Sequence, residues 1–214
     1  MNGYRVEEIE YEDTKEFILE KHYAQRMPPV SYAFGLFRHD EMVGVLTIGK
    51  PVSRTLCVGI CGQQHAHKVY ELNRLITLDG LDRNVLSYFV SGALRKLKKE
   101  DLIIVSYADS GVGHHGYIYQ ATNFLYTGAT KERTDQYRPG NKHHRHADNR
   151  YKHLRKVRTS KHRYVYFTGN KRKYMKLLNY EILPYPKGDN RTYELGTKIG
   201  TKVLDRITGK TWHE

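Results

Sequence analysis

The residues best suited to chemistry lie in residues 106–123, where an apolar run gives way to polar residues and glycines. Asp109 follows a buried-type strand predicted over residues 102–107, and Tyr119 lies ten residues further on, in a short predicted helix. Open α/β sheets bind ligands at such strand ends, and the intervening glycines allow a close approach of the backbone. There a carboxylate can act as a general base or metal ligand, and a phenol as an acid or ligand. The alternative is a polar loop in which Asp109 only caps the next helix.

Two further groups of polar residues lie upstream. His22 and Tyr23 end the first predicted helix, and on their own they are typical of a surface histidine beside a packed tyrosine. A predicted central strand alternates polar and apolar residues, so its polar face offers Glu71 and Asn73, joined by Arg74 if the strand is bulged. Polar groups on a central strand are costly unless they are satisfied, so this face predicts a site.

The two cysteines stand near two histidines in the order Cys57-x3-Cys61-x3-His65-x-His67. Two thiolates and two imidazoles suit a tetrahedral structural zinc site, but this spacing differs from that of the usual zinc knuckles. We therefore expect reduced, partly buried thiols in a loop over residues 50–66. Two cysteines also exclude a disulfide scaffold.

The positive charge of the chain is concentrated in one segment. Lysine and arginine number 36 against 23 acidic residues, a formal charge of +13, and residues 131–176 hold 16 of the former and three of the latter. The rest of the chain is therefore neutral. Five histidines and several aromatic residues also lie in this segment. Basic side chains neutralise phosphates and aromatic rings stack on bases, so the segment predicts nucleic-acid binding. The alternatives are a disordered tail, an acidic protein partner or a membrane surface.

Composition limits the class of protein. The chain has 214 residues, of which 39% are hydrophobic and 12% aromatic, which excludes wholesale disorder. No apolar run reaches the roughly 18 residues of a membrane span, and the polar N-terminus does not resemble a signal peptide. We expect a soluble, cytoplasmic protein. Walker, Rossmann and Gly-x-Ser-x-Gly motifs, and the Asp-Pro-Pro-Tyr loop of DNA adenine methyltransferases, are not found.

The predicted elements alternate between helix and strand. Asp13 begins the first helix with a capping box, and the clearest helix has one apolar stripe over residues 84–98. Their order predicts an α/β (α+β) protein with a mixed central sheet flanked by helices, which fits a GNAT-type acetyltransferase. The helices are expected over residues 13–22, 84–98 and 117–123, and the strands over residues 30–37, 42–48, 69–78, 102–107, 124–126 and 164–167, the first two of these strands forming a hairpin.

Several stretches of this sequence resemble the Mom family of bacteriophage proteins, which modify adenine in DNA. The resemblance covers roughly residues 20–137, and residues 161–167 and 183–188 resemble an extension found in a subset of the family. The stretches that carry it are Ser31-Tyr32-Ala33-Phe34-Gly35-Leu36, Val43-Gly44-Val45, Glu71-Leu72-Asn73-Arg74-Leu75, Ser106-Tyr107-Ala108-Asp109, Gly113-His114, Tyr119-Gln120-Ala121-Thr122-Asn123-Phe124 and Tyr126-Thr127-Gly128.

The resemblance implies a GNAT-like fold and conversion of the adenine N6 amine to a carbamoylmethyl derivative. This modification protects phage DNA from host restriction, so the protein would act in the cytoplasm of the infected bacterium. The resemblance also implies an active-site cluster with a proposed iron ion, and two residues that meet an acyl-coenzyme A type donor. Carried over, the cluster is His22, Tyr23, Asp109 and Tyr119, and the donor residues are Arg74 and Ser87.

One segment departs from the acetyltransferase pattern. Typical acetyltransferases place a glycine-rich pyrophosphate loop before the long helix, but residues 78–84 have one glycine and two acids. Acids are unfavourable beside a pyrophosphate, so the donor need not be coenzyme A itself. Two alternative functions are a GNAT-like acyltransferase acting on a protein or small amine, and a non-catalytic nucleic-acid-binding protein.

We also expect direct contacts to double-stranded DNA with a flipped adenine. The division expected is a catalytic core over residues 1–135 and a basic extension over residues 136–214 that packs on the core and contacts DNA. The residues expected to contact substrate or DNA are Asn73, Ser110, His114, His115, Asn123, Lys142, Arg145, Lys161, Arg163 and Tyr164.

Overall fold

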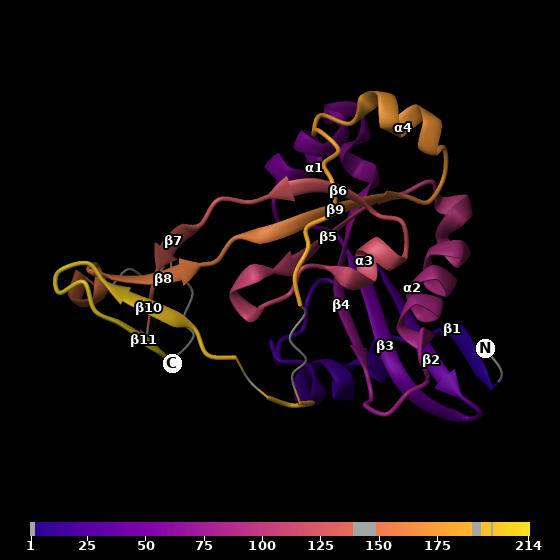
Figure 1. Ribbon diagram of the computed structural model, residues 1–214, viewed down its shortest axis with the longest axis horizontal. Helices are drawn as coiled ribbons and strands as arrows, with labels where there is room; N and C mark the ends of the chain where they lie inside the picture. The colour runs from indigo at the N-terminus through magenta and orange to yellow at the C-terminus, as the bar shows by residue number, and fades with distance from the viewer. Residues whose placement is uncertain (1–2, 139–148, 190–193, 198) are drawn as a thin grey trace.

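A seven-stranded sheet forms the body of the protein in the computed structural model, which describes residues 3–138, 149–189, 194–197 and 199–214 (Figure 1). Its strand order is β1-β2-β3-β4-β5-β9-β6, in which β4 and β5 pair in parallel and the other neighbours pair antiparallel. The strands are β1 (Tyr4–Glu8), β2 (Tyr32–Arg38), β3 (Glu41–Gly49), β4 (Val69–Thr77), β5 (Ile103–Asp109), β6 (Leu125–Ala129) and β9 (Lys161–Phe167).

Helices cover both faces of this sheet. The α-helices are α1 (Arg54–Cys61), α2 (Val85–Lys96), α3 (Tyr117–Ala121) and α4 (Lys171–Leu177). The shorter turns are the π-helix η2 (Phe17–Lys21) and the 3-10 turns η1 (Glu12–Thr14), η3 (Gln63–Lys68), η4 (Leu97–Glu100), η5 (Ser110–Val112) and η7 (Asn149–Tyr151). No helix of the described residues is long and apolar enough to cross a membrane.

Alternation along β5 explains why both faces are covered. Ile104 belongs to the cluster that α2 covers with Phe89, whereas Ile103 and Val105 belong to the cluster that α1 covers. Successive side chains of a strand point to opposite faces, so an unbroken apolar run must be buried on both. These side chains are fully buried, and the hydrophobic effect thereby fixes α1 and α2 on opposite sides of the sheet.

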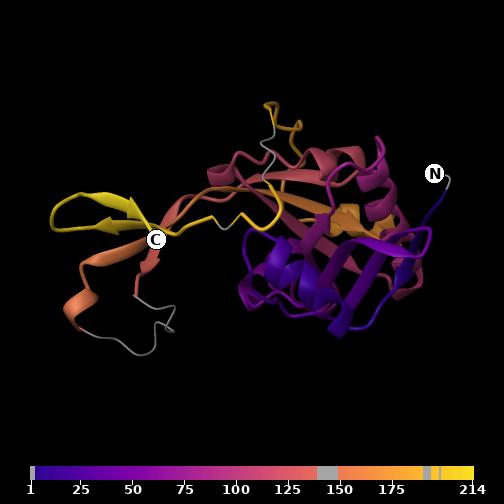
Figure 2. The ribbon, with the colours of Figure 1, turned by 90° about the horizontal axis from the view of Figure 1, so that it is seen from below.

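A second, four-stranded antiparallel sheet has the order β11-β10-β8-β7. Figures 1 and 2 show it as an arm that projects from the body, where the ribbons of β6 and β9 continue into β7 and β8. We call it the arm sheet. Its strands are β7 (Arg133–Gln136), β8 (Leu154–Arg158), β10 (Lys202–Asp205) and β11 (Thr211–His213).

The predicted fold class is confirmed, with a mixed sheet flanked by helices. The β2–β3 hairpin and the elements β4, α2, β5, α3 and β9 lie where the sequence predicts them, within a few residues. The loop predicted over residues 50–66 is wrong, because residues 54–61 form α1. Ser53 caps this helix by accepting the Leu56 backbone N–H at 3.2 Å, a signal that the prediction overlooked.

The start of the first helix is also predicted wrongly. The Asp13 carboxylate accepts the backbone N–H of Glu10 at 3.1 Å, and Asp13 lies inside η1 rather than before a helix. The chain then forms the π-helix η2, which ends at His22 as expected. Strand β1 was not predicted, because it is a short edge strand with charged residues and weak patterning.

The segment predicted as a basic extension contributes to both sheets. Strand β9 lies between β5 and β6, so residues 161–167 belong to the body. Strand β6 pairs with β9 at the edge of the body sheet, so the strand predicted over residues 164–167 is part of the same sheet. The division into two domains at residue 135 stays a prediction.

Candidate active site

Strands β4 and β5 separate beyond a short paired stretch. Their parallel pairing ends at Leu72 and Ser106, after which β4 continues along β3 to Thr77 and β5 continues along β9 to Asp109. Strand β4 is bulged, the condition under which Arg74 was expected to join its polar face: Thr47 faces Arg74 and Ile48 faces Leu72, which leaves the intervening Asn73 outside the register.

Asn73 holds the bulge in place. Its Oδ1 accepts the Thr47 hydroxyl at 2.7 Å, and its Nδ2 donates to the Pro29 carbonyl at 2.8 Å. Asn73 was expected to contact substrate or DNA, but these two bonds give its amide a structural role at the branch point.

His22 and Tyr23 leave η2 as a stacked pair. The ring centroids are 4.2 Å apart, and His22 is buried. The Ala24 backbone N–H donates to His22 Nδ1 at 3.0 Å, so the proton of the neutral ring is on Nε2. Burial, together with the nearby charges of Arg74 and His114, lowers the pKa of His22 to about 3. The imidazole is therefore neutral at physiological pH.

Arg74 connects β4 to the chain that follows η2. Its guanidinium donates to the carbonyls of Asn73 and Arg26, both at 2.7 Å, and its Nε is buried without a hydrogen bond to the described residues. Burial lowers the pKa of Arg74, whereas Tyr23 raises it. Arg74 thus lies beside the His22–Tyr23 pair. Ser87, the other predicted donor residue, is in the first turn of α2 and donates to the Asn84 carbonyl at 2.9 Å.

Tyr119 lies on the α2 face of the sheet, among the aromatic rings of the core. Its ring centroid is 5.2 Å from that of Tyr164 and 5.3 Å from that of Phe124. Burial raises the pKa of Tyr119 far above its ordinary value, Tyr23 raises it further, and a hydrogen bond with Ser106 opposes the rise. The phenol is therefore protonated and able to donate a hydrogen bond near Tyr23.

Asp109, the last residue of β5, has three partners. Its Oδ1 accepts the Gly111 backbone N–H at 3.0 Å and the Thr159 hydroxyl at 2.5 Å, and its Oδ2 pairs with Lys161 Nζ at 3.0 Å. The capping alternative for Asp109 is thus present in the structure. Alternation along β5 directs Asp109 to the same face as Tyr107, away from the face of Ser106 and Tyr119.

Glu71 is a second carboxyl group on this face. It is partly buried on β4, where it pairs with Val105 one residue before the last parallel pair. Burial raises its pKa, while Lys161 and Arg74 lower it. Lys161 thus pairs with Asp109 and also acts electrostatically on Glu71. The sequence indicated Glu71 only through the alternation of its strand, and its neighbour Lys161 arrives from a distant segment.

A cavity of about 240 Å³ opens beside the His22–Tyr23 pair. Its walls come from the end of η2, from the part of β4 beyond the pairing with β5, from His114, and from the C-terminal segment. The lining residues are Lys21, His22, Tyr23, Leu75, Ile76, Thr77, Asp79, His114, Glu194 and Leu195.

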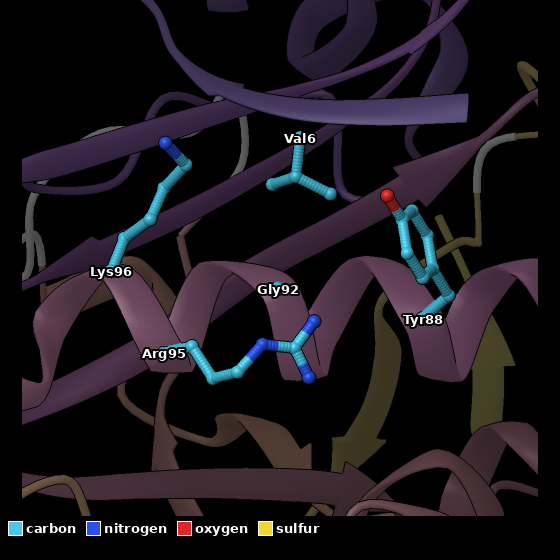
Figure 3. Close-up of a pocket in the computed structure, with 5 residues that line it drawn as sticks. All are labelled: Val6, Tyr88, Gly92, Arg95 and Lys96. Atoms are coloured by element: carbon cyan, nitrogen blue, oxygen red, sulfur yellow. The ribbon is translucent and has the colours of Figure 1, made fainter. Parts of the chain in front are cut away.

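A larger hollow of about 310 Å³ lies between β1 and α2 (Figure 3). Val6, Tyr88 and Gly92 line it, with the side chains of Arg95 and Lys96 beside them. None of the residues predicted for catalysis lines this hollow, so we place the candidate site at the smaller cavity and the divergence of β4 and β5.

Several predicted DNA contacts have structural roles instead. Tyr164 is fully buried in the core, and its hydroxyl donates to the His115 carbonyl, so its ring cannot stack on DNA. Arg163 donates to the Thr127 carbonyl at 2.7 Å and lies 3.4 Å from the Tyr180 ring centroid. The prediction for Tyr164 is corrected, because β9 is a core strand, whereas that for the partly exposed Arg163 stays a prediction.

The other residues predicted to contact substrate or DNA lie in different parts of the structure. Ser110 donates to the Ser160 carbonyl at 2.6 Å, and Asn123 has a positive φ of 62° in the turn after α3. His115 lies 5.6 Å from the His162 ring, whereas His114 lines the cavity. Lys142 and Arg145 lie outside the described residues.

The described residues do not assemble a metal site. They contain no group of three or more His, Cys, Asp or Glu side chains able to hold an ion, and Cys57 and Cys61 are free and buried. Iron does not fit His22, because the Nδ1 lone pair accepts the Ala24 N–H and Nε2 carries the ring proton. The loop before α2 carries Asp79 and Asp82, and the identity of the donor stays a prediction. We derive no step through an iron ion or coenzyme A.

Comparison with known proteins gives a match over most of the chain. The model of the Mom protein family matches residues 3–187. A relative named methylcarbamoylase mom, from Escherichia phage Mu, is 30% identical over 202 residues, which cover 86% of this chain and 83% of that protein.

Similar solved structures are acetyltransferases. An N-acetyltransferase from Staphylococcus aureus Mu50 has a TM-score of 0.48 at 9% identity, covering 77% of this chain and 98% of that chain. A GNAT family acetyltransferase from Elizabethkingia anophelis has a TM-score of 0.44 at 8% identity, covering 78% of this chain and 99% of that chain.

Proposed function

Because this chain belongs to the Mom protein family, we propose that it is a phage DNA-modifying transferase that converts the N6 amine of adenine in DNA to N6-carbamoylmethyladenine. The observation that carries the proposal is the family match over residues 3–187, supported by the phage Mu methylcarbamoylase. The modification would protect phage DNA from restriction in the cytoplasm of the infected host.

The chemistry imposes three requirements on the site. The adenine amine is a weak nucleophile, because its lone pair is delocalised into the ring, and in a duplex the base is paired and stacked. The enzyme must therefore flip the base, hold a donor with an activated carbamoylmethyl group, and accept a proton. The amine nitrogen bonds to the methylene carbon, the donor's leaving group departs with the bonding electron pair, and the amine proton passes to a base.

The candidate site offers groups for these roles. Asp109 and Glu71 are the carboxyl groups beside the divergence of β4 and β5, and we assign Asp109 as the proton acceptor. Lys161 holds the Asp109 carboxylate in place through their 3.0 Å ion pair. Neutral His22, Tyr23 and the protonated Tyr119 position substrate by hydrogen bonding and stacking. We assign Arg74 and Ser87 to the donor.

The arm sheet and the basic segment would hold the DNA. Residues 131–176 carry the whole excess of positive charge, and this segment includes β7 and β8. Contacts to phosphates release counterions, so duplex binding should weaken steeply with salt. An affinity that hardly changes between low and moderate salt would contradict this part of the proposal.

Mass spectrometry of nucleosides from DNA of cells expressing the protein tests the function. The wild-type chain should give a new adenosine derivative whose mass identifies the transferred group, and Asp109→Ala should not. Asp40→Asn is the control, because its side chain is fully exposed on the β2–β3 turn. Unchanged nucleosides in cells where the protein is folded and binds DNA would favour the non-catalytic alternative.

A further inference from the structure

The cavity beside His22 and Tyr23 combines rings, apolar side chains and acids. Tyr23 stacks on His22, and the His114 ring stands edge-on to Tyr23 with centroids 6.1 Å apart. Leu75 and Leu195 add apolar surface. Rings that are stacked on one another and flanked by apolar groups form a wall suited to a flat, poorly solvated ligand.

Two carboxylates also line this cavity. Asp79 and Glu194 are acceptors when ionised, and both lie at exposed positions of the rim. An exocyclic amine is a donor, whereas the O6 of guanine and the O4 of thymine are acceptors at the corresponding position. Carboxylates at the rim therefore favour adenine or cytosine, which present an amine at this position, over guanine and thymine, which present an oxygen.

Hydrogen bonds hold the C-terminal segment that carries Glu194 against the chain around His22 and Tyr23. The Gly196 N–H donates to the Lys21 carbonyl at 2.9 Å, and the Gln25 side chain donates to the Gly196 carbonyl at 3.1 Å. The Ile199 N–H donates to the Tyr23 carbonyl at 3.4 Å. This segment lies beyond residues 3–187, so part of the cavity comes from outside the region that matches the family.

We propose that this cavity holds the flipped target adenine, with its ring against the His22–Tyr23–His114 wall and one N–H of its N6 amine donating to the acidic rim of Glu194 and Asp79, which leaves the other N–H for the transfer. The inference rests on the proposed function and adds the residues that select the base. It also gives a role to Asp79 in the loop before α2, where a carboxylate would be unfavourable beside a pyrophosphate. Two of the candidate catalytic residues, His22 and Tyr23, line the cavity, so a base held there lies beside them.

Binding to two single-stranded oligonucleotides tests the assignment. One carries a single central adenine, and the other carries nebularine, a purine that lacks the exocyclic amine, in the same place. Fluorescence anisotropy should show that the wild-type chain binds the adenine oligonucleotide about 10-fold or more tightly. Glu194→Gln and Asp79→Asn should each reduce this preference. Glu181→Gln, an exposed residue that lines neither cavity, should keep it.

The outcomes separate the assignment from the proposed function. Equal affinity of the wild-type chain for both oligonucleotides, in a protein that does modify adenine in cells, would overturn the cavity assignment alone. An unchanged preference in both acid variants would do the same. A chain that neither binds DNA nor changes its nucleosides would overturn the proposed function and the assignment with it.

Discussion

In the body of the molecule, apolar side chains are buried on both faces of the sheet, whereas the arm sheet buries one residue, Val203, in its four strands. Those four strands carry five basic residues and two aspartates. Arg155 pairs with Thr134 and Gln136 through hydrogen bonds rather than apolar packing. The comparison indicates that the body provides stability and positions the chemistry, while the arm presents charge.

The largest effect on stability is expected in the body. Phe89 is fully buried in the cluster beneath α2, so Phe89→Ala should lower the free energy of unfolding by about 3–5 kcal/mol. Urea denaturation measures this loss, and Val203→Ala in the arm sheet is the comparison. An equal loss in the Val203 variant would show that the arm shares the main core.

The largest effect on activity is expected at Asp109. Asp109→Asn preserves shape but removes the proton acceptor, so adenine modification should fall about 100-fold or more. The amount of modified nucleoside per cell measures it, with Asp40→Asn as the control. Glu71→Gln should have the smaller effect, and the reverse order would move the proton acceptor to Glu71.

The buried neutral His22 predicts a dependence of stability on pH. Its pKa is about 3 when folded and near 6.5 when unfolded, so the unfolded chain binds more protons between these values. The contribution of His22 to the free energy of unfolding is nearly complete above pH 6.5. It decreases below that pH, by about 2 kcal/mol between pH 7 and pH 5. His22→Gln should lose this part of the pH dependence. Parallel curves for both proteins in urea denaturation would contradict the burial of a neutral ring.

The arm should govern the salt dependence of DNA binding. Arg133→Gln in β7 should weaken duplex binding for all sequences and reduce the slope of log affinity against log salt by about 1. Arg38→Gln at the end of β2 is the matched control in the body, and its slope should equal that of the wild type. Equal losses in both variants would mean that the body, rather than the arm, contacts the phosphates.

The smallest effect is expected for an ion pair of the arm. Arg158 and Asp135 lie 2.7 Å apart and are both solvent-exposed, so Asp135→Asn should cost less than about 1 kcal/mol of stability. Thermal denaturation at low and high salt measures it, and salt should remove most of the difference. A larger, salt-insensitive loss would mean that the arm depends on this pair for its fold.

Much of the fold could be predicted because its elements have strong local patterns. The helical periodicity of the apolar residues in α2 and the continuous apolar run of β5 predict these two elements directly. Helix α1 was not predicted, because residues 50–66 were interpreted from the spacing of their cysteines and histidines. Ser53 was the available signal for the start of the helix. The edge strand β1 has no such pattern.

The sequence identified several residues of the candidate site, but it did not predict which contacts those residues make. The bulge at Asn73 followed from polar residues on a central strand, and the histidine that ends η2 was identified through the family resemblance. The partners of Asp109 were not predictable, because Lys161 and Thr159 come from a segment about 50 residues away. Tyr164 was misread as a surface residue for the same reason.

The sequence by itself determined the apolar periodicities, the location of the excess charge and the membership of the family, since each depends on the identity and order of residues. The tertiary structure alone decided that β9 lies between β5 and β6, that Lys161 pairs with Asp109, and that Glu194 lines the cavity beside His22. Local patterns fix which face of an element is buried. Which distant segments then meet depends on how those faces pack, and that is a property of the whole chain.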